Sequence, residues 1–252
     1  MKYKAVIIAL ESKLKERGYP TKELLDSLDC IETCSMLKAT TPSEINYEYI
    51  HPHVTTTIRD RKVLFSFYDL TDIKQAACAI SHIRCWKLCV KLQEPIIICE
   101  DDVVQYSKLL KKTQFSLKNV ENSLRNIHML SLLHLGSNGF QGIVNNLFQS
   151  HDKIYKVKHC FSGLQLYYLT PEGAKLLLKW CYPITMQIDK YVGDCTSRGL
   201  QLYVAGKSNC QFNILDSTLG HSLPKMVTVP LILSCIILIL IIFIFFKNRK
   251  IK

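Results

Sequence analysis

The sequence predicts an α/β domain with a largely parallel sheet, and three observations support that prediction. Residues 4–10 and 96–99 are short, wholly apolar runs, as expected for strands buried on both faces. Residues 75–92, between those runs, have the apolar period of a helix. Further strand-like and helix-like segments alternate toward residue 205, an order typical of a sheet covered by helices.

The first part of the chain contains two predicted strands and one predicted helix. We expect a strand at residues 4–10, a helix at residues 12–28 and a short strand at residues 63–68. Gly18-Tyr19-Pro20 is expected to interrupt the helix, because glycine and proline are strong local breakers. Residues 38–60 show no helical or strand period, and we expect a loop there.

Residues 75–92 form the helix around which the rest of the prediction is organised. One face of this helix carries Ala79, Ile83, Trp86 and Val90. A neighbouring stripe carries Cys78, His82, Cys85, Cys89 and Leu92. Glu94-Pro95 is expected to end the helix, since the residue before proline is pushed out of the helical region. The strand at residues 96–99 follows directly.

The second part of the chain continues the alternation. We expect helices at residues 103–112 and 116–126, and strands at residues 128–135, 155–157, 164–169 and 201–205. A turn is expected at residues 137–142. Another helix should begin at Thr170-Pro171, because threonine is a good N-cap and proline fits the first helical position. It should end before Pro183.

Three adjacent acids, Glu100, Asp101 and Asp102, follow the strand at residues 96–99. The carboxyl ends of strands are where open α/β sheets bind ligands. Adjacent carboxylates repel one another unless a cation neutralises them, and Mg²⁺ and Mn²⁺ prefer oxygen ligands. The acids therefore indicate a metal site, and a solvated acidic turn is the alternative.

The motifs around this stretch come in the order found in one enzyme family. They are Leu70-Thr71, Ser81-His82, Trp86, Glu100-Asp101-Asp102, His134-Leu135-Gly136, Gly163 to Tyr168, Gly173-Ala174 and Ile188-Asp189. This ordered set resembles glycosyltransferase family 25, the lipopolysaccharide and procollagen galactosyltransferase type. The resemblance covers roughly residues 60–220.

The resemblance implies a single nucleotide-sugar-binding domain, GT-A-like and Rossmann-like, which we place at residues 1–222. Its expected activity is transfer of a hexose from a nucleotide-diphosphate sugar, such as UDP-galactose or UDP-glucose, to an unidentified acceptor hydroxyl. Asp102, helped by Glu100 or Asp101, would hold Mn²⁺ (or Mg²⁺), and Asp189 would act as the catalytic base.

The side chains of Ser81, His82 and Tyr167 are expected to line the donor site. Core packing is the common alternative for a strand tyrosine. A satisfied helix histidine is the alternative for His82. For Asp189, the alternative is a carboxylate at the start of a helix that is stabilised by the helix dipole.

The first predicted strand departs from the family pattern. The family continues this strand into an Asn-Leu and a pair of arginines that handle the sugar nucleotide, whereas this chain has Ile8-Ala9-Leu10 with Lys13, Lys15 and Arg17 nearby. A second reading is therefore open. The chain would be a catalytically degenerate, membrane-attached domain that acts as a binding or scaffolding module.

The net charge of +11 suits anionic lipids, nucleic acids or phosphorylated substrates, but no nucleic-acid motif is present and no nucleic-acid partner is expected. The 11 cysteines show no Cys-x-x-Cys and no disulfide framework, which favours a reducing compartment. Two cysteine pairs are spaced so that on a helix both thiols share a face: Cys30/Cys34 and Cys85/Cys89. With His51 and His53 they allow a zinc site, and buried free thiols are the alternative.

Residues 226–246 are apolar without a single charge and are long enough to cross a membrane as a helix. A short basic tail, residues 247–252, follows them. Basic flanks usually stay cytosolic, which would place the domain on the far side, but no signal peptide is recognised at the start of the sequence. We therefore expect a single-pass, tail-anchored protein with its domain facing the cytosol.

Overall fold

The fold is known from a computed structural model of the 252-residue chain. The structure describes residues 2–52, 54, 70, 72–106, 117, 127–133, 154–157, 161 and 163–205. All of them belong to the first of two units into which the chain divides, Met1–Cys210.

Within the described residues, seven strands form one mixed sheet in the order β2-β1-β3-β6-β4-β7-β5. The strands are β1 (Tyr3–Ala9), β2 (Ile31–Lys38), β3 (Ile96–Glu100), β4 (Met129–Leu133), β5 (Ile154–Lys156), β6 (Leu166–Leu169) and β7 (Leu202–Ala205). β1 is parallel to β2 and β3, and β4 is parallel to β7. β6 runs antiparallel to β3 and β4, and β5 runs antiparallel to β7.

The expected α/β class is confirmed, and the mixed sheet with helices on its faces fits a Rossmann-like fold. The expectation of a largely parallel sheet is wrong. β6 lies between β3 and β4 but runs against both. Its four residues are all buried, like those of a central parallel strand, so composition alone does not reveal its direction.

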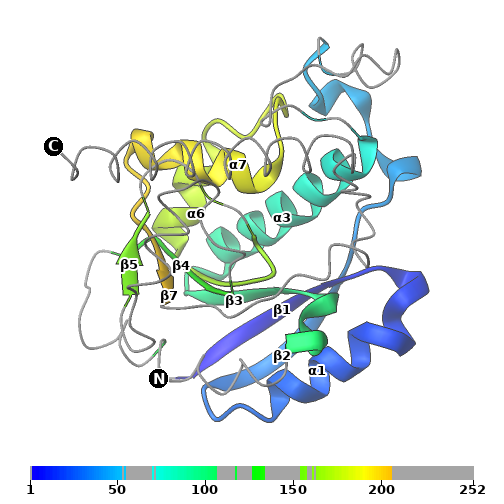
Figure 1. The fold of residues 1–252 in the computed structure, drawn as a ribbon, viewed down its shortest axis with the longest axis vertical. Helices are drawn as coiled ribbons and strands as arrows, with labels where there is room; N and C mark the ends of the chain where they lie inside the picture. The colour runs from blue at the N-terminus through cyan, green and yellow to red at the C-terminus, as the bar shows by residue number, and fades with distance from the viewer. Residues whose placement is uncertain are drawn as a thin grey trace, which may run out of the picture. The chain divides into compact units, whose positions relative to one another are not determined.

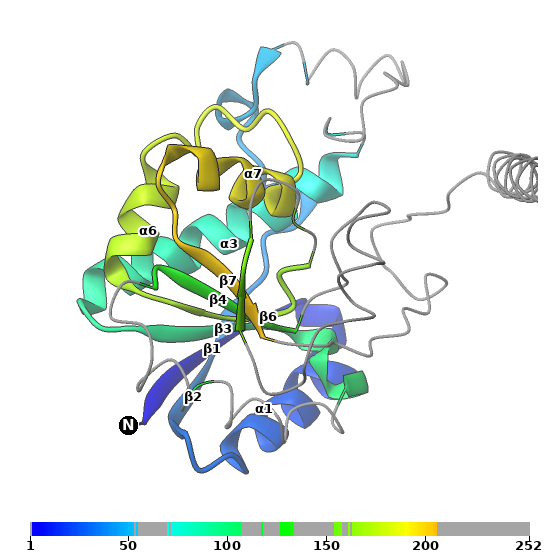
Figure 2. The same cartoon turned by 60° about the vertical axis from the view of Figure 1, so that its left-hand side comes forward.

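Helices cover both faces of the sheet (Figure 1, Figure 2). One face carries α3 (Ile73–Leu92), α6 (Pro171–Leu178) and α7 (Ile188–Asp194), and the other carries α1 (Tyr19–Asp26). The short helical turns are η1 (Glu11–Lys13), the π-helical η2 (Leu14–Gly18), η3 (Pro42–Glu44), η4 (Tyr47–Tyr49), η5 (Asp101–Tyr106) and η6 (Cys195–Arg198). The core accordingly divides into two clusters, one on each side of the sheet.

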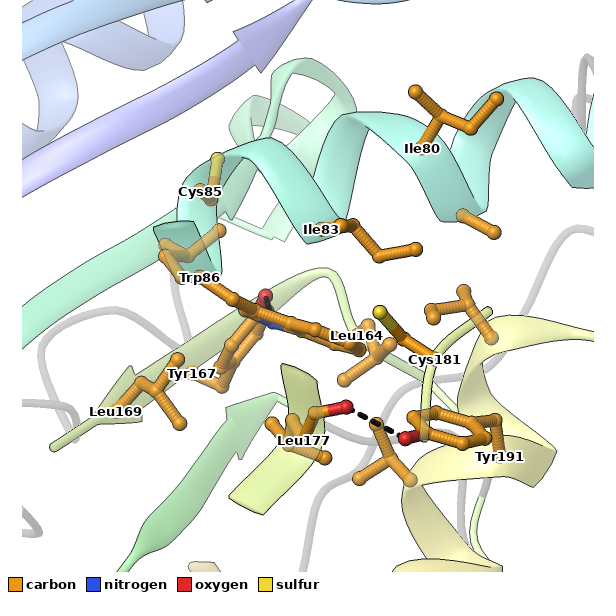
Figure 3. Packing of buried hydrophobic residues seen from close by; sticks show 14 of the residues in the cluster. Ile80, Ile83, Cys85, Trp86, Leu164, Tyr167, Leu169, Leu177, Cys181 and Tyr191 are labelled. Carbon is orange, nitrogen blue, oxygen red and sulfur yellow. Dashed lines mark hydrogen bonds between the residues drawn. The ribbon is translucent and has the colours of Figure 1, made fainter. Parts of the chain in front are cut away.

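The α3 helix is the centre of the larger cluster, as the sequence predicted. The Asp72 carboxylate accepts a hydrogen bond from Lys74 N (2.8 Å) and caps the start, and Gln93 ends the helix in the left-handed conformation (φ 55°). Trp86 is fully buried and stacks on Tyr191 of α7, with 6.2 Å between ring centroids (Figure 3). The Tyr191 hydroxyl donates to Leu177 O of α6 at 2.6 Å. These contacts join three helices.

The α6 helix begins as expected. The Thr170 hydroxyl accepts a hydrogen bond from Gly173 N (3.1 Å), and Pro171 occupies the first turn. A β-carbon built on Gly173 would lie 2.5 Å from His128 O. Only glycine therefore allows the helix to pack this closely on the chain entering β4.

Several predictions for the first part of the chain need correction. Residues 31–38 form β2, which the sequence analysis missed because most of its side chains are exposed or half-buried and no apolar run marks it. Cys34 therefore lies in a strand and Cys30 in the turn before it, so the expected helical cysteine pair is wrong there. Gly18-Tyr19-Pro20 does not interrupt the helical segment. Pro20 lies in the first turn of α1, where the helix requires no hydrogen bond from the backbone N–H that proline lacks.

The strands predicted at 4–10, 128–135, 155–157, 164–169 and 201–205 are confirmed with shifts of at most two residues at their ends. Residues 63–68, 137–142, 226–246 and 247–252 lie outside the described residues, as do most of 103–126 and the His134-Leu135-Gly136 motif. In the part of the chain that the structure describes, no helix has the length and apolar composition needed to span a membrane.

Candidate functional site

The three acids lie at a switch point in the strand order of the sheet. β1 and β3 are parallel neighbours, and the chain leaves β1 toward β2 but leaves β3 toward the opposite edge. Such a switch point, at the carboxyl ends of the strands, is the usual ligand site of open α/β sheets. Leu10 N, just beyond β1, donates to the Asp101 carboxylate at 3.0 Å across this point.

Strand alternation gives the first two acids different surroundings. The Asp101 side chain is buried and holds Leu10, while its backbone oxygen accepts from the Thr21 hydroxyl of α1 at 2.8 Å. Burial raises the pKa of Asp101, and the Leu10 hydrogen bond opposes that rise. Asp101 therefore ties the end of β1 and α1 to the carboxyl end of β3. Glu100 faces α3, and a quarter of its side chain is exposed.

Glu100 ends a buried chain of hydrogen bonds that begins at Trp86. Trp86 Nε1 donates to Tyr167 Oη (3.0 Å), because an indole nitrogen is only a donor. The Tyr167 hydroxyl can then donate to His82 Nδ1, which lies 3.0 Å away. That assignment leaves a proton on His82 Nε2, 3.2 Å from Glu100 Oε1. His82 thus orients the Glu100 carboxylate.

Asp102 is the third acid of the cluster. Its Oδ1 is buried and has no hydrogen-bond partner among the described residues. Burial, followed by the charges of Glu100 and Asp101, raises the pKa of Asp102 to about 7, and Arg17 opposes the rise. Arg17 also opposes the rise at Asp101, so one guanidinium lies close enough to act on both carboxyls. A cation beside Asp102 would relieve an unfavourable buried charge.

Asp189 approaches the same place from α7. Burial, followed by the charges of Glu100, Asp189 and Asp102, raises the pKa of the Cys78 thiol well above its usual value. Three carboxylates from β3, η5 and α7 therefore lie close enough to act on one thiol. Asp189 Oδ1 accepts from Lys190 N at 2.8 Å, and the buried Lys190 ammonium lies 3.9 Å from Oδ2.

Cys78, His82 and Glu100 also form a cluster that could hold a metal. One ligand atom from each lies within 4.8 Å of the other two. Cys78 and His82 are one turn apart on α3 and share a face. Among the described residues, this is the one group of three metal-ligating side chains gathered so closely.

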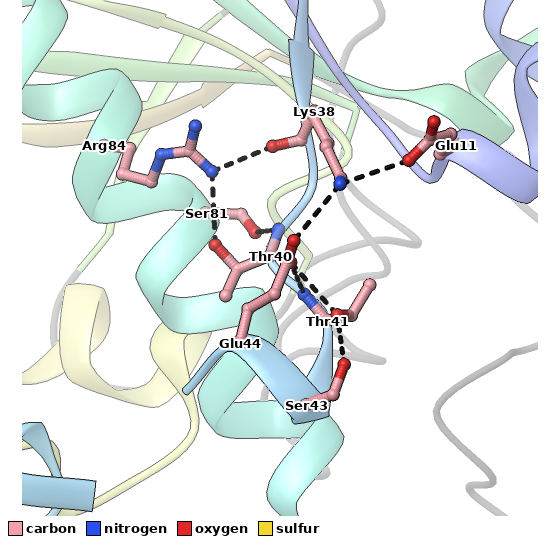
Figure 4. A network of polar contacts seen from close by, with 8 residues as sticks. All are labelled: Glu11, Lys38, Thr40, Thr41, Ser43, Glu44, Ser81 and Arg84. Carbon is pink, nitrogen blue, oxygen red and sulfur yellow. Dashed lines mark hydrogen bonds and ion pairs between the residues drawn. The ribbon is translucent and has the colours of Figure 1, made fainter. Parts of the chain in front are cut away.

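Two residues predicted to line the donor site are buried. The Ser81 hydroxyl donates to Ala77 O (2.9 Å) and accepts from Thr40 N (2.8 Å), so it fastens the segment after β2 to α3 (Figure 4). Arg84 supports the same contact by donating to Lys38 O at 2.9 Å. Tyr167 has no exposed surface, so any effect on a ligand would pass through His82.

A family model described as glycosyltransferase family 25 (LPS biosynthesis protein) matches residues 3–192 of the chain. The chain belongs to glycosyltransferase family 25. This membership indicates that the protein is a glycosyltransferase, with a sugar donor and an acceptor as its substrates. No curated protein matched the chain in a separate sequence comparison.

In this glycosyltransferase His82 contacts Glu100 directly, and the charges of Glu100, Asp102 and Asp189 all act on the Cys78 thiol. Two further residues lie beside Glu100 and were not predicted from the sequence: Cys78 and Gln165. Cys78 had a signal, because it precedes His82 by one helical turn. Gln165 had no such signal in the sequence, because only strand pairing brings it beside the acids. Its backbone oxygen accepts a hydrogen bond from Glu100 N at 2.8 Å.

Proposed function

We propose that the protein transfers a hexose from a nucleotide-diphosphate sugar, such as UDP-galactose or UDP-glucose, to an acceptor hydroxyl. Asp102 and Glu100 would hold Mn²⁺ or Mg²⁺, which neutralises charge on the departing nucleotide. The unpartnered Asp102 oxygen beside Glu100 is the observation that carries this proposal. Oxygen ligands at a strand end suit both ions.

The other residues would bind and position the substrates. His82 would hold the Glu100 carboxylate through its Nε2 proton, with Tyr167 and Trp86 fixing the ring behind it. Arg17 would face the diphosphate, since its charge already acts on Asp101 and Asp102. Asp189 would accept the proton of the acceptor hydroxyl, with Lys190 fixing its carboxylate.

Binding of UDP in the presence of Mn²⁺ tests this assignment. Asp102→Asn removes one charge and keeps the shape, so metal-dependent UDP affinity should fall more than tenfold, or more than about 1.4 kcal/mol. Asp29→Asn is the matched control, because Asp29 is an exposed aspartate outside the acidic cluster. Unchanged UDP affinity in the Asp102 variant would contradict the assignment. A panel of nucleotide sugars then identifies the donor.

A degenerate, non-catalytic domain is the second candidate function, and one observation favours it. Two cations near the end of β1 are paired with one acid: Lys13 Nζ lies 2.5 Å and Arg17 Nε 3.3 Å from the Glu16 carboxylate. An active enzyme should unfold at a higher temperature when UDP and Mn²⁺ are added together, because a ligand that binds only the folded state stabilises it. A scaffold that has lost the donor site should show no such shift.

We also propose that residues 226–246 anchor the protein as a single membrane-spanning helix with the domain on the cytosolic side. The apolar, uncharged composition of that segment supports the anchor. It leaves residues 1–222 as the catalytic part.

A further inference from the structure

The Cys78–His82–Glu100 cluster has the ligand chemistry of a softer metal than Mn²⁺ or Mg²⁺. Thiolate and imidazole ligands favour zinc, whereas magnesium and manganese favour oxygen. We propose that Cys78, His82 and Glu100 bind Zn²⁺ at a site distinct from the Asp102 oxygen site. The two sites share Glu100, so the two metals would exclude one another.

The spacing of the ligand atoms fits tetrahedral zinc. At Zn–N and Zn–O distances of about 2.0–2.1 Å, a tetrahedral angle separates two such ligands by about 3.3 Å. His82 Nε2 and Glu100 Oε1 are 3.2 Å apart. A sulfur at about 2.3 Å from the metal belongs about 3.6 Å from the other ligands. The Cys78 sulfur is already within 4.8 Å of both, so a small side-chain movement completes the geometry.

The surroundings of His82 also fit a ligand role. A metal-bound histidine usually donates its other ring N–H to a neighbouring acceptor, and Tyr167 Oη lies 3.0 Å from Nδ1. On binding, the Cys78 thiol would release its proton to solvent as the zinc–sulfur bond forms. The His82 proton would move from Nε2 to Nδ1, so the imidazole stays neutral and Nε2 gains a free lone pair.

Gln165 provides an independent sign of a ligand. Its Oε1 is buried without a partner among the described residues, and the residue is only 9% exposed. Cys99 pairs with Leu166 in the antiparallel register, so Gln165 lies opposite Glu100 and shares its face of the sheet. Its amide oxygen would fill the fourth position, directly or through a water molecule.

Visible and near-ultraviolet spectra of the Co²⁺-loaded protein test this proposal, because Co²⁺ can replace Zn²⁺ and is spectroscopically visible. The full chain is studied in detergent with its thiols kept reduced. We expect one Co²⁺ to give intense visible bands of a tetrahedral site and a near-ultraviolet thiolate-to-cobalt band, and Zn²⁺ to displace it. Cys78→Ser should abolish the thiolate band and weaken Zn²⁺ binding at least tenfold. Cys34→Ser, another half-buried free thiol, should change neither.

The metal is the only probe, so the outcome is independent of whether the protein transfers a sugar. A wild-type cobalt spectrum without the thiolate band would overturn the proposal, and so would a band that Cys78→Ser leaves intact. If Cys78→Ser does not fold, Glu100→Gln decides. It should keep the thiolate band at saturating Co²⁺ but bind Zn²⁺ at least tenfold more weakly, and an unchanged affinity would also overturn the proposal.

Discussion

At Asp102, burial and two neighbouring acids make the charged form unfavourable in the folded protein. The pKa rises from an ordinary 3.8 to about 7, so between those values the folded state keeps a proton that the unfolded state has lost. The free energy of unfolding contributed by this group therefore falls as pH rises from about 4 to about 7. Above pH 7 the Asp102 carboxylate is charged in both states, and the folded state carries the full energetic cost of burying that charge.

Asp102→Asn should consequently stabilise the metal-free protein at pH 8 by several kcal/mol, since a shift of about three pKa units corresponds to roughly 4 kcal/mol. The gain over wild type should shrink as the pH falls toward 4, where both proteins carry a neutral group. Urea unfolding in a chelator at several pH values measures the difference, with Asp29→Asn as an exposed control. A variant that is less stable than wild type at pH 8 would contradict the burial of this charge.

Tyr167 matters through its hydroxyl, which serves Trp86 and His82 at once. Tyr167→Phe leaves Trp86 Nε1 and His82 Nδ1 buried without this partner. We expect a loss of about 1–3 kcal/mol of stability, since an unsatisfied buried polar group costs that much. Tyr19→Phe, at a tyrosine that is 48% exposed, should change stability by less than about 0.5 kcal/mol. Equal effects in denaturant unfolding would rule out a special role for the Tyr167 hydroxyl.

At the scale of elements, the packing of α6 against β4 depends on one missing side chain. Gly173→Ala would place a β-carbon 2.5 Å from His128 O, a backbone atom that also accepts from Thr170 N at 2.9 Å. Although alanine favours helices, we expect a net loss of about 1–3 kcal/mol from the clash. Lys175→Ala, an exposed change on the same helix, should stay within about 0.5 kcal/mol. A neutral Gly173→Ala in thermal unfolding would refute the close approach.

The site is likewise a product of how elements meet. β3 supplies Glu100, α3 supplies His82 and Cys78, and α7 supplies Asp189. The stacking of Trp86 on Tyr191 fixes α7 against α3 (Figure 3). The core that stabilises the fold therefore also holds the helix that carries Asp189.

For the whole molecule, the proposed anchor and the proposed catalytic part should separate cleanly. The full chain should remain in membranes after alkaline carbonate extraction, whereas a chain ending at residue 222 should be recovered without detergent. Leu238→Lys places a charge inside the proposed span, at a cost of about 2.5–3.5 kcal/mol, and should reduce membrane retention. Leu238→Ile should not. Full extraction of the wild-type chain by carbonate would refute the anchor.

The sequence by itself determined those features whose physics is local. Apolar runs located β1 and β3, helical period located α3, and Thr170-Pro171 located the start of α6. The ordered motifs identified the family, because each is a short stretch that keeps its identity in the linear chain. They also pointed to Glu100, Asp102, His82 and Asp189 as candidate site residues, and that assignment stays a prediction.

The tertiary structure decided what depends on contacts between distant residues. The direction of β6 and the existence of β2 follow from strand pairing, which leaves little trace in composition. Pairing also placed Gln165 opposite Glu100, and helix packing brought Asp189 near Cys78. Asp101 and Asp102 are adjacent in sequence, yet Asp101 accepts a hydrogen bond from Leu10 N, whereas Asp102 Oδ1 is buried with no partner among the described residues. Burial and hydrogen bonding set those roles, and both exist only after the chain has folded.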